Sequence, residues 1–186
     1  MEFYASRWRE INSGFWMSFE NNPRLEETKK NIYIRCLPCL EKLFEQLAEE
    51  PHSLLLEEPL NCWKVIVVLN SVEECLELLD LYQEEKFPVN CNIRGRVGSR
   101  DKNSSSVVVL FHMLDEDVRD KVMSDVKELT PEINPSYSLF YERGCQDTYG
   151  VLCGDWSTWG RETPVKNREQ IPVIREKVNK LLKGQY

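Results

Sequence analysis

The sequence predicts an α+β protein with one hydrophobic core, in which strands and helices follow the order β-α-β-β-α-β. Two observations support this prediction. First, short apolar runs rich in β-branched residues stand at residues 63–69 and 107–113, and such residues favour strands. Second, each run is followed by a stretch whose apolar residues recur three and four positions apart, which is the spacing of a helix that buries one face.

The first half of this core is a strand followed by a helix. Residues 63–69 are apolar apart from Lys64, and Asn70 and Ser71 come next. Serine is a favoured N-cap, because its hydroxyl oxygen accepts a backbone N–H of the first helical turn. We therefore predict a helix that begins after Ser71 and carries the apolar residues Val72, Cys75, Leu76, Leu79 and Leu81.

The second half begins with a predicted hairpin. Residues 89–97 alternate, with Val89, Cys91, Ile93 and Val97 on one face and Asn90, Asn92, Arg94 and Arg96 on the other. This alternation is typical of a strand with one wet face. A polar loop, residues 98–105, leads into the next strand at residues 107–113, so the pair is predicted to be antiparallel.

A second helix and a fourth strand complete the core. The acidic residues 115–117 favour a helix start through the helix dipole, and we expect this helix to end before Pro131 because proline interrupts helices. Residues 137–141 then form the fourth predicted strand. This order is the ferredoxin-like, or split βαβ, arrangement: a four-stranded antiparallel sheet with two helices on one face.

The flanking segments extend this core within a single predicted domain. We predict an N-terminal aromatic arm and helical extension over residues 1–58, the ferredoxin-like core over 59–143, and a loop rich in Gly, Trp and Cys followed by a basic helix over 144–186. Between residues 24 and 50, Pro38 interrupts a helical pattern. The segment is therefore either one kinked helix or a short extended piece followed by a helix that starts near Pro38.

Composition narrows the class of protein. A chain of 186 residues can bury a core without disulfide or metal staples, and it has no apolar run of the roughly 20 residues that a membrane span needs. Its first residues lack the pattern of a secretion signal. The seven cysteines are not spaced like a disulfide framework, so we expect reduced thiols and a cytoplasmic location.

The charge is unevenly distributed. The net charge of −7 argues against a protein that coats nucleic acid along its whole surface. There are 12 acidic and 2 basic residues between Glu41 and Glu85, whereas residues 161–186 hold 7 basic and 3 acidic residues. The basic tail would dock either on the acidic part of its own fold or on a partner.

Cysteines supply one candidate site. Cys36 and Cys39 form a C-x-x-C pair that we expect at a helix start, where backbone amides lower the pKa of a thiol. The pair, Cys-Leu-Pro-Cys followed by Leu-Glu-Lys-Leu-Phe, resembles a thioredoxin active-site segment over fewer than twenty residues, and this resemblance implies a redox role. The alternatives are two buried cysteines, or a zinc site that adds Cys145 and Cys153.

Basic residues supply a second candidate site. Arg94 and Arg96 lie on the polar face of a predicted strand, with Arg100 and Lys102 at the hairpin tip. Two arginines at i and i+2 point the same way and would bind a phosphate or carboxylate. Tyr137 and Tyr141 on the fourth strand would add stacking surfaces, a combination that readers of single-stranded RNA use. The alternative is a solvated face with local ion pairs, or an oligomer contact.

No hydrolase or phosphate-loop signature is present. We interpret His52 and His112 as structural, although His112 would be the base if Cys145, beside Arg143, were a nucleophile. The leading hypothesis is a non-enzymatic binding or assembly module with no cofactor or metal, which uses the arginine face for an anionic small molecule, RNA or a protein partner. The alternatives are a thiol-dependent redox protein or enzyme, and a structural homo-oligomer joined through the aromatic arm, residues 1–22.

Overall fold

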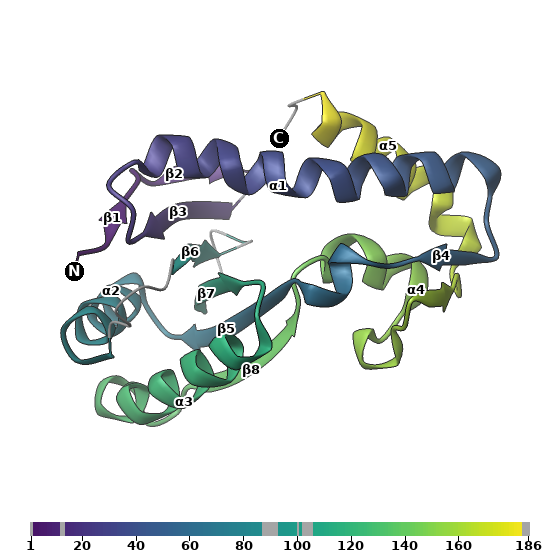
Figure 1. Cartoon of the computed structure of the whole chain (residues 1–186). Helices are drawn as coiled ribbons and strands as arrows, with labels where there is room; N and C mark the ends of the chain where they lie inside the picture. Colours follow the sequence, from purple (N-terminus) through teal and green to yellow (C-terminus); the bar gives the residue numbers. More distant parts are fainter. Residues whose placement is uncertain (1, 12–13, 87–92, 100, 102–105, 184–186) are drawn as a thin grey trace. The chain divides into compact units, whose positions relative to one another are not determined.

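The computed structural model describes residues 2–11, 14–86, 93–99, 101 and 106–183, apart from the side chains of residues 11 and 25–35. In these ranges the fold is mixed α+β, with five α-helices and a mostly antiparallel sheet (Figure 1). Within the described ranges, each helix is too short or too polar to span a bilayer.

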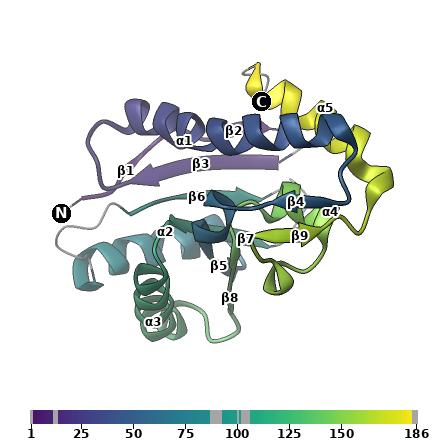
Figure 2. The same cartoon turned by 45° about the vertical axis from the view of Figure 1, so that its right-hand side comes forward.

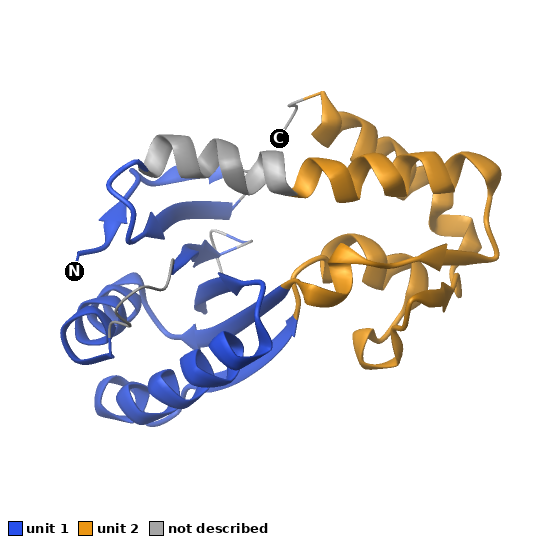
Figure 3. Cartoon of the chain, viewed as in Figure 1, with its two compact units in different colours: residues 1–29, 63–142 blue, residues 30–62, 143–186 orange. Residues whose placement is uncertain are grey.

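The chain divides into two compact units, and each unit is built from two separate segments (Figure 3). Unit 1 comprises residues 1–29 and 63–142, and unit 2 comprises residues 30–62 and 143–186. These units differ from the three consecutive segments predicted from the sequence. Strand β8 returns beside β5, so the second segment of unit 1 begins and ends at neighbouring strands.

The sheet of unit 1 contains seven strands in the order β1-β3-β6-β7-β5-β8, with β2 paired to β3. All the strand pairs with an assigned register are antiparallel. The strands are β1 (Tyr4–Ala5), β2 (Arg9–Ile11), β3 (Gly14–Glu20), β5 (Trp63–Leu69), β6 (Arg94–Ser99), β7 (Val107–Met113) and β8 (Ser138–Arg143).

The N-terminal aromatic segment corrects the predicted four-stranded sheet. It supplies β1, β2 and β3, and β3 pairs with β6 of the same chain along its length. Met17 and Phe19 are buried, and Trp16 on the opposite face is half-buried. Because aromatic side chains occupy both faces of β3, the alternation that marks a half-wet strand was hidden in the sequence.

Two helices, α2 (Val72–Leu81) and α3 (Glu116–Ile133), cover one face of this sheet (Figures 1 and 2). The predicted N-cap of α2 is confirmed, since Ser71 Oγ accepts the Glu74 amide at 3.2 Å. The predicted end of α3 is wrong, because the helix continues through Pro131. The Thr130 hydroxyl donates to the Val126 carbonyl at 2.6 Å, and the Asn134 amide donates to the Thr130 carbonyl at 2.9 Å, so hydrogen bonds surround the proline.

Aromatic rings fill the space between the sheet and these helices. Phe111 on β7 is fully buried, with its ring centroid 5.5 Å from that of Phe19 and 5.4 Å from that of Tyr82. Gly95 on β6 makes room for them, since a Cβ there would lie 2.4 Å from Phe19 Cζ and 1.9 Å from the Leu110 carbonyl oxygen. The core of unit 1 therefore depends on a glycine in the middle of a strand.

Unit 2 is a smaller helical unit with one two-stranded ribbon. It contains most of α1 (Leu25–Gln46), β4 (Ser53–Leu55), α4 (Val151–Cys153), β9 (Glu162–Pro164), α5 (Ile171–Leu182) and five short helical turns, η1 (Leu47–Glu49), η2 (Glu58–Asn61), η4 (Gln146–Gly150), η5 (Trp156–Thr158) and η6 (Arg168–Gln170). Strand β4 pairs antiparallel with β9. The predicted C-terminal helix is confirmed as α5, with Pro172 in its first turn.

Helix α1 runs without a break through Pro38. Of the two interpretations of this segment, the single helix is therefore the observed one. Leu43 and Leu47 are buried in a core with Leu54, Leu152 and Trp159, and this burial offsets the hydrogen bond that the proline cannot donate.

Candidate functional site

A row of charged side chains crosses the sheet of unit 1. In the strand register, Glu20 on β3 lies opposite Arg94 on β6, Arg94 lies opposite His112 on β7, and His112 lies opposite Lys64 on β5. Lys64 Nζ then reaches Glu142 Oε1 on β8 at 2.6 Å. We call these five residues the charged row. It brings together groups that lie up to 122 positions apart in the sequence.

The charged row lies on the face of the sheet opposite α2 and α3. Trp63, which precedes Lys64, points to the helices, because its ring lies 4.2 Å from the Arg119 guanidinium on α3. Side chains alternate along a strand, so Lys64 points the other way. Arg96 shares the face of Arg94 and lies opposite Ser18 and Leu110.

The predicted pairing of Arg94 and Arg96 on one face is therefore observed, and Lys64 and His112 join them. A planar guanidinium binds a carboxylate or phosphate through two parallel hydrogen bonds. Two guanidiniums beside an ammonium and an imidazole form a concentrated donor surface on β6, β7 and β5. Glu20 and Glu142 stand at the two ends of the charged row, so its basic groups are flanked by carboxylates.

This face is less exposed than the sequence suggested. Only 5% of Lys64 and 3% of Glu20 is exposed, and Arg94, Arg96 and His112 are half-buried. The prediction of a wet face assumed that polar residues on alternate positions meet solvent. In the strand register they lie opposite one another, and their low exposure strengthens the electrostatic interactions between neighbouring charges.

The two tyrosines predicted as stacking surfaces are not beside the arginines. Tyr141 lies on the helix-covered face, with its ring 5.7 Å from Trp63 and 4.5 Å from the Arg119 guanidinium. Tyr137 precedes β8, and β7 and β5 separate β8 from β6. Arg100 and Lys102 lie outside the described residues.

Sequence reasoning missed Lys64, Glu20 and Glu142 as members of the site, and it interpreted His112 as structural. A signal for Lys64 was available, because it is the one charged residue in the apolar run from Trp63 to Leu69. A lysine in a buried strand requires a nearby acceptor. The acceptor, Glu142, could not be identified without knowing that β8 lies beside β5.

The predicted redox thiols occupy a different setting from the one expected. Cys36 and Cys39 lie inside α1 and not at its start, so the amides of a helix N-terminus do not act on them. Burial and the neighbouring Cys62 raise the pKa of the Cys39 thiol to about 11. At neutral pH this thiol is protonated, which disfavours its action as a nucleophile.

Cys145 and Cys153, the two cysteines of the alternative zinc site, lie in different surroundings. A hydrogen bond with Cys62, followed by burial, raises the pKa of Cys145 well above its ordinary value. Cys153 lies fully buried in the apolar core of unit 2, where burial raises its pKa to about 11. The structure thus places Cys62 beside Cys145 and leaves Cys153 among hydrophobic side chains.

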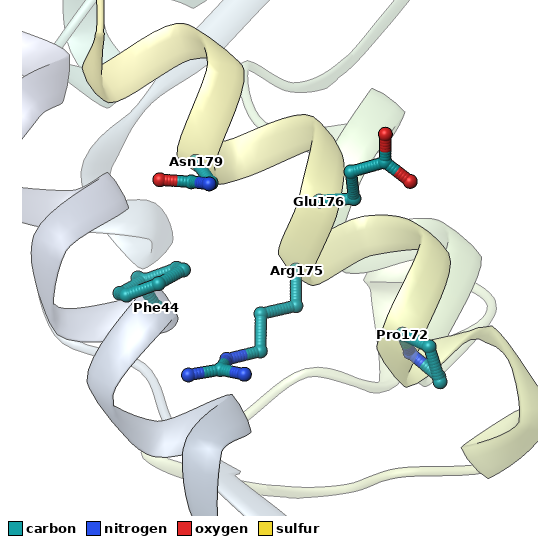
Figure 4. Close-up of a pocket in the computed structure, with 5 residues that line it drawn as sticks. All are labelled: Phe44, Pro172, Arg175, Glu176 and Asn179. Carbon is teal, nitrogen blue, oxygen red and sulfur yellow. The ribbon is translucent and has the colours of Figure 1, made fainter.

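Unit 2 also contains an open pocket of about 280 Å³ between α1 and α5 (Figure 4). Phe44, Pro172, Arg175, Glu176 and Asn179 line it. The Arg175 guanidinium lies 4.7 Å from the centre of the Phe44 ring, which is within the range of a cation–π contact. Its charged side chains belong to the exposed surface of α5, so the pocket lacks the buried polar groups typical of a catalytic site.

No protein-family model, curated protein or solved structure matches the chain. Function is therefore inferred from the charged row and the thiols themselves.

Proposed function

We propose that the chain is a non-enzymatic binding module, and that Arg94 and Arg96, assisted by Lys64 and His112, bind one carboxylate or phosphate group of a ligand or partner. The observation that carries this proposal is the register of β6 and its neighbours, which gathers these four basic side chains on one face. Because they come from three adjacent strands, the backbone fixes their spacing without the flexibility of a loop.

Partial burial supports binding of a single anionic group more than binding of an extended polyanion. A half-buried guanidinium interacts strongly with one desolvated anion, whereas nucleic acid usually binds exposed basic residues along its backbone. The stacking residues that would support RNA recognition, Tyr137 and Tyr141, are not beside the arginines. An anionic small molecule or a carboxylate on a protein partner is therefore the favoured ligand class.

The ferredoxin-like assignment belongs to the same proposal. The segments β5-α2-β6-β7-α3-β8 follow the β-α-β-β-α-β order, and within the larger sheet these strands stand in the order β6-β7-β5-β8 with both helices on one face. On this assignment, β3 extends the core beside β6. The arginines then occupy an interior strand and not an edge.

The experiment is calorimetric titration of the purified chain with phosphate and with citrate at low and high salt. We expect saturable binding that weakens in high salt and that Arg94→Gln with Arg96→Gln reduces at least tenfold, while the variant still unfolds cooperatively. Arg161→Gln, on an exposed residue of unit 2, is the matched control and should bind normally.

Two outcomes would contradict the proposal. If the double variant bound both anions as tightly as the parent chain, the arginines would not be the binding groups. If it lost its cooperative unfolding transition, Arg94 and Arg96 would be structural parts of the charged row.

A further inference from the structure

Four cysteines from separate stretches of unit 2 meet at one place. Cys36 and Cys39 stand one helical turn apart on α1, Cys62 directly precedes β5, and Cys145 follows β8. Residues three apart on a helix lie on the same side of it. Cys62 and Cys145 flank neighbouring strands, since β5 lies beside β8 in the sheet.

Backbone contacts hold this cluster together independently of the thiols. The Gly144 amide donates to the Cys62 carbonyl at 2.8 Å, and a Cβ at Gly144 would lie 3.2 Å from Cys62 Cβ. Tyr149 links the other members, since its amide donates to the Cys145 carbonyl at 3.0 Å and its hydroxyl donates to the Cys39 carbonyl at 3.3 Å. The fold therefore positions the chain segments that carry these four cysteines.

We propose that Cys36, Cys39, Cys62 and Cys145 form a four-thiolate site for a zinc ion. A C-x-x-C pair with two further cysteines is a ligand set typical of structural zinc. Zinc–sulfur bonds of about 2.3 Å place neighbouring sulfurs roughly 3.8 Å apart. The site is separate from the charged row and independent of the anion-binding proposal.

The zinc-bound state requires a local adjustment of these side chains. Among the residues that the structure describes, no three His, Cys, Asp or Glu side chains stand in ligating positions, so the thiols must rotate about their Cα–Cβ bonds to converge. The six described cysteines are reduced. On binding, four S–H bonds give way to four Zn–S bonds, and the released protons pass to the buffer.

Cys153 is excluded from the site, since it is fully buried in the apolar core of unit 2 with Leu152 and Val178. A zinc ion supplies the charge that the four proposed ligands need, because a divalent cation stabilises the thiolates that coordinate it.

The first experiment is titration of the reduced, metal-free chain with Co²⁺, followed by displacement with Zn²⁺. We expect one equivalent to produce the thiolate charge-transfer and tetrahedral absorption bands, which zinc then removes. Cys62→Ser and Cys145→Ser should each weaken zinc binding at least tenfold. Cys153→Ser is the matched control from the same unit and should leave the spectrum and the affinity unchanged.

A second experiment uses the unaltered chain, so it does not depend on whether a variant folds. Alkylation with and without zinc is followed by peptide mass spectrometry. We expect zinc to slow labelling of the four proposed ligands and to leave Cys75 and Cys153 unaffected.

Three results would overturn the zinc assignment. In the first, the chain gives no thiolate–cobalt bands and zinc does not protect its thiols from alkylation. In the second, Cys153→Ser weakens zinc binding as much as Cys145→Ser does, and in the third, the purified protein contains iron with sulfide. Because the readouts are metal spectra and thiol labelling, failure of the anion-binding proposal would leave them unchanged.

Discussion

The ion pair between Lys64 and Glu142 should stabilise unit 1 mainly by preventing the burial of an uncompensated charge. Lys64 Nζ lies 2.6 Å from Glu142 Oε1, and the Lys64 side chain is 6% exposed. At this distance, with an effective dielectric constant near 20, the attraction is about 6 kcal/mol before desolvation is subtracted. Glu142 is 20% exposed, so solvent screens part of this energy.

The perturbation is Glu142→Gln, which leaves the Lys64 ammonium without this carboxylate. Removing one member of a buried pair costs about 3–5 kcal/mol, and we expect about 3 kcal/mol because Glu142 is partly exposed. Lys64→Met should cost less, since it leaves a partly hydrated carboxylate. The double variant Lys64→Met with Glu142→Gln should be close to Lys64→Met alone, because the ammonium that Glu142 compensates is then absent.

The assay is urea unfolding of the four proteins, combined with hydrogen exchange of peptides from β5 and β8. Hydrogen exchange locates the loss of stability within unit 1. A change of less than about 0.5 kcal/mol for Glu142→Gln is the size expected of a surface position. That result, or additive effects in the double variant, would refute the conclusion that Lys64 is desolvated and depends on Glu142.

Two further predictions concern the packing of β6 and the buried thiols. Gly95→Ala should lower the free energy of unfolding in urea by about 3 kcal/mol, because the added carbon overlaps the Leu110 carbonyl and Phe19. The control is Gly160→Ala, whose added carbon meets nothing within 4 Å and should change that free energy by less than about 0.5 kcal/mol. Equal effects of the two substitutions would contradict the close packing around Gly95. Folding raises the pKa of Cys39 from 9.0 to about 11 through burial, so its contribution to stability is complete below pH 9.0 and is lost as pH rises to about 11. Cys39→Ala should therefore lose less stability over this interval than the parent chain, and identical losses in urea midpoints would show that the thiol does not titrate with folding.

Two kinds of element in unit 1 could be predicted from the sequence: short apolar strands, and a helix that begins with an N-cap residue. Strand β5 and the capped start of α2 were predicted at their observed positions because β-branched residues and an N-cap serine are local signals. The signal for β3 failed because aromatic residues on both of its faces removed the alternation. Pro131 was misjudged because the hydrogen bonds that surround it depend on Thr130 and Asn134, whose roles emerge only in the folded helix.

The candidate sites were predictable only in part, because their geometry is set by strands distant in sequence. Alternation alone placed Arg94 and Arg96 on one face. The addition of Lys64 and His112 required the register of β5 and β7, which local patterns do not contain. Likewise, the cysteine motif identified Cys36 and Cys39, but the choice of Cys62 over Cys153 depends on Cys62 preceding β5 and Cys145 following β8.

The interleaved course of the chain imposes an order of events during synthesis. Strand β3 is made early, but β6, its partner in the sheet, is made only after the first segment of unit 2 has emerged. Unit 2 in turn waits for α5 at the end of the chain. Contacts between such distant segments slow folding. The aromatic strand β3 can thus pair with β1 and β2 at once, but the edge that β6 covers in the folded chain stays open until residues 94–99 have been made.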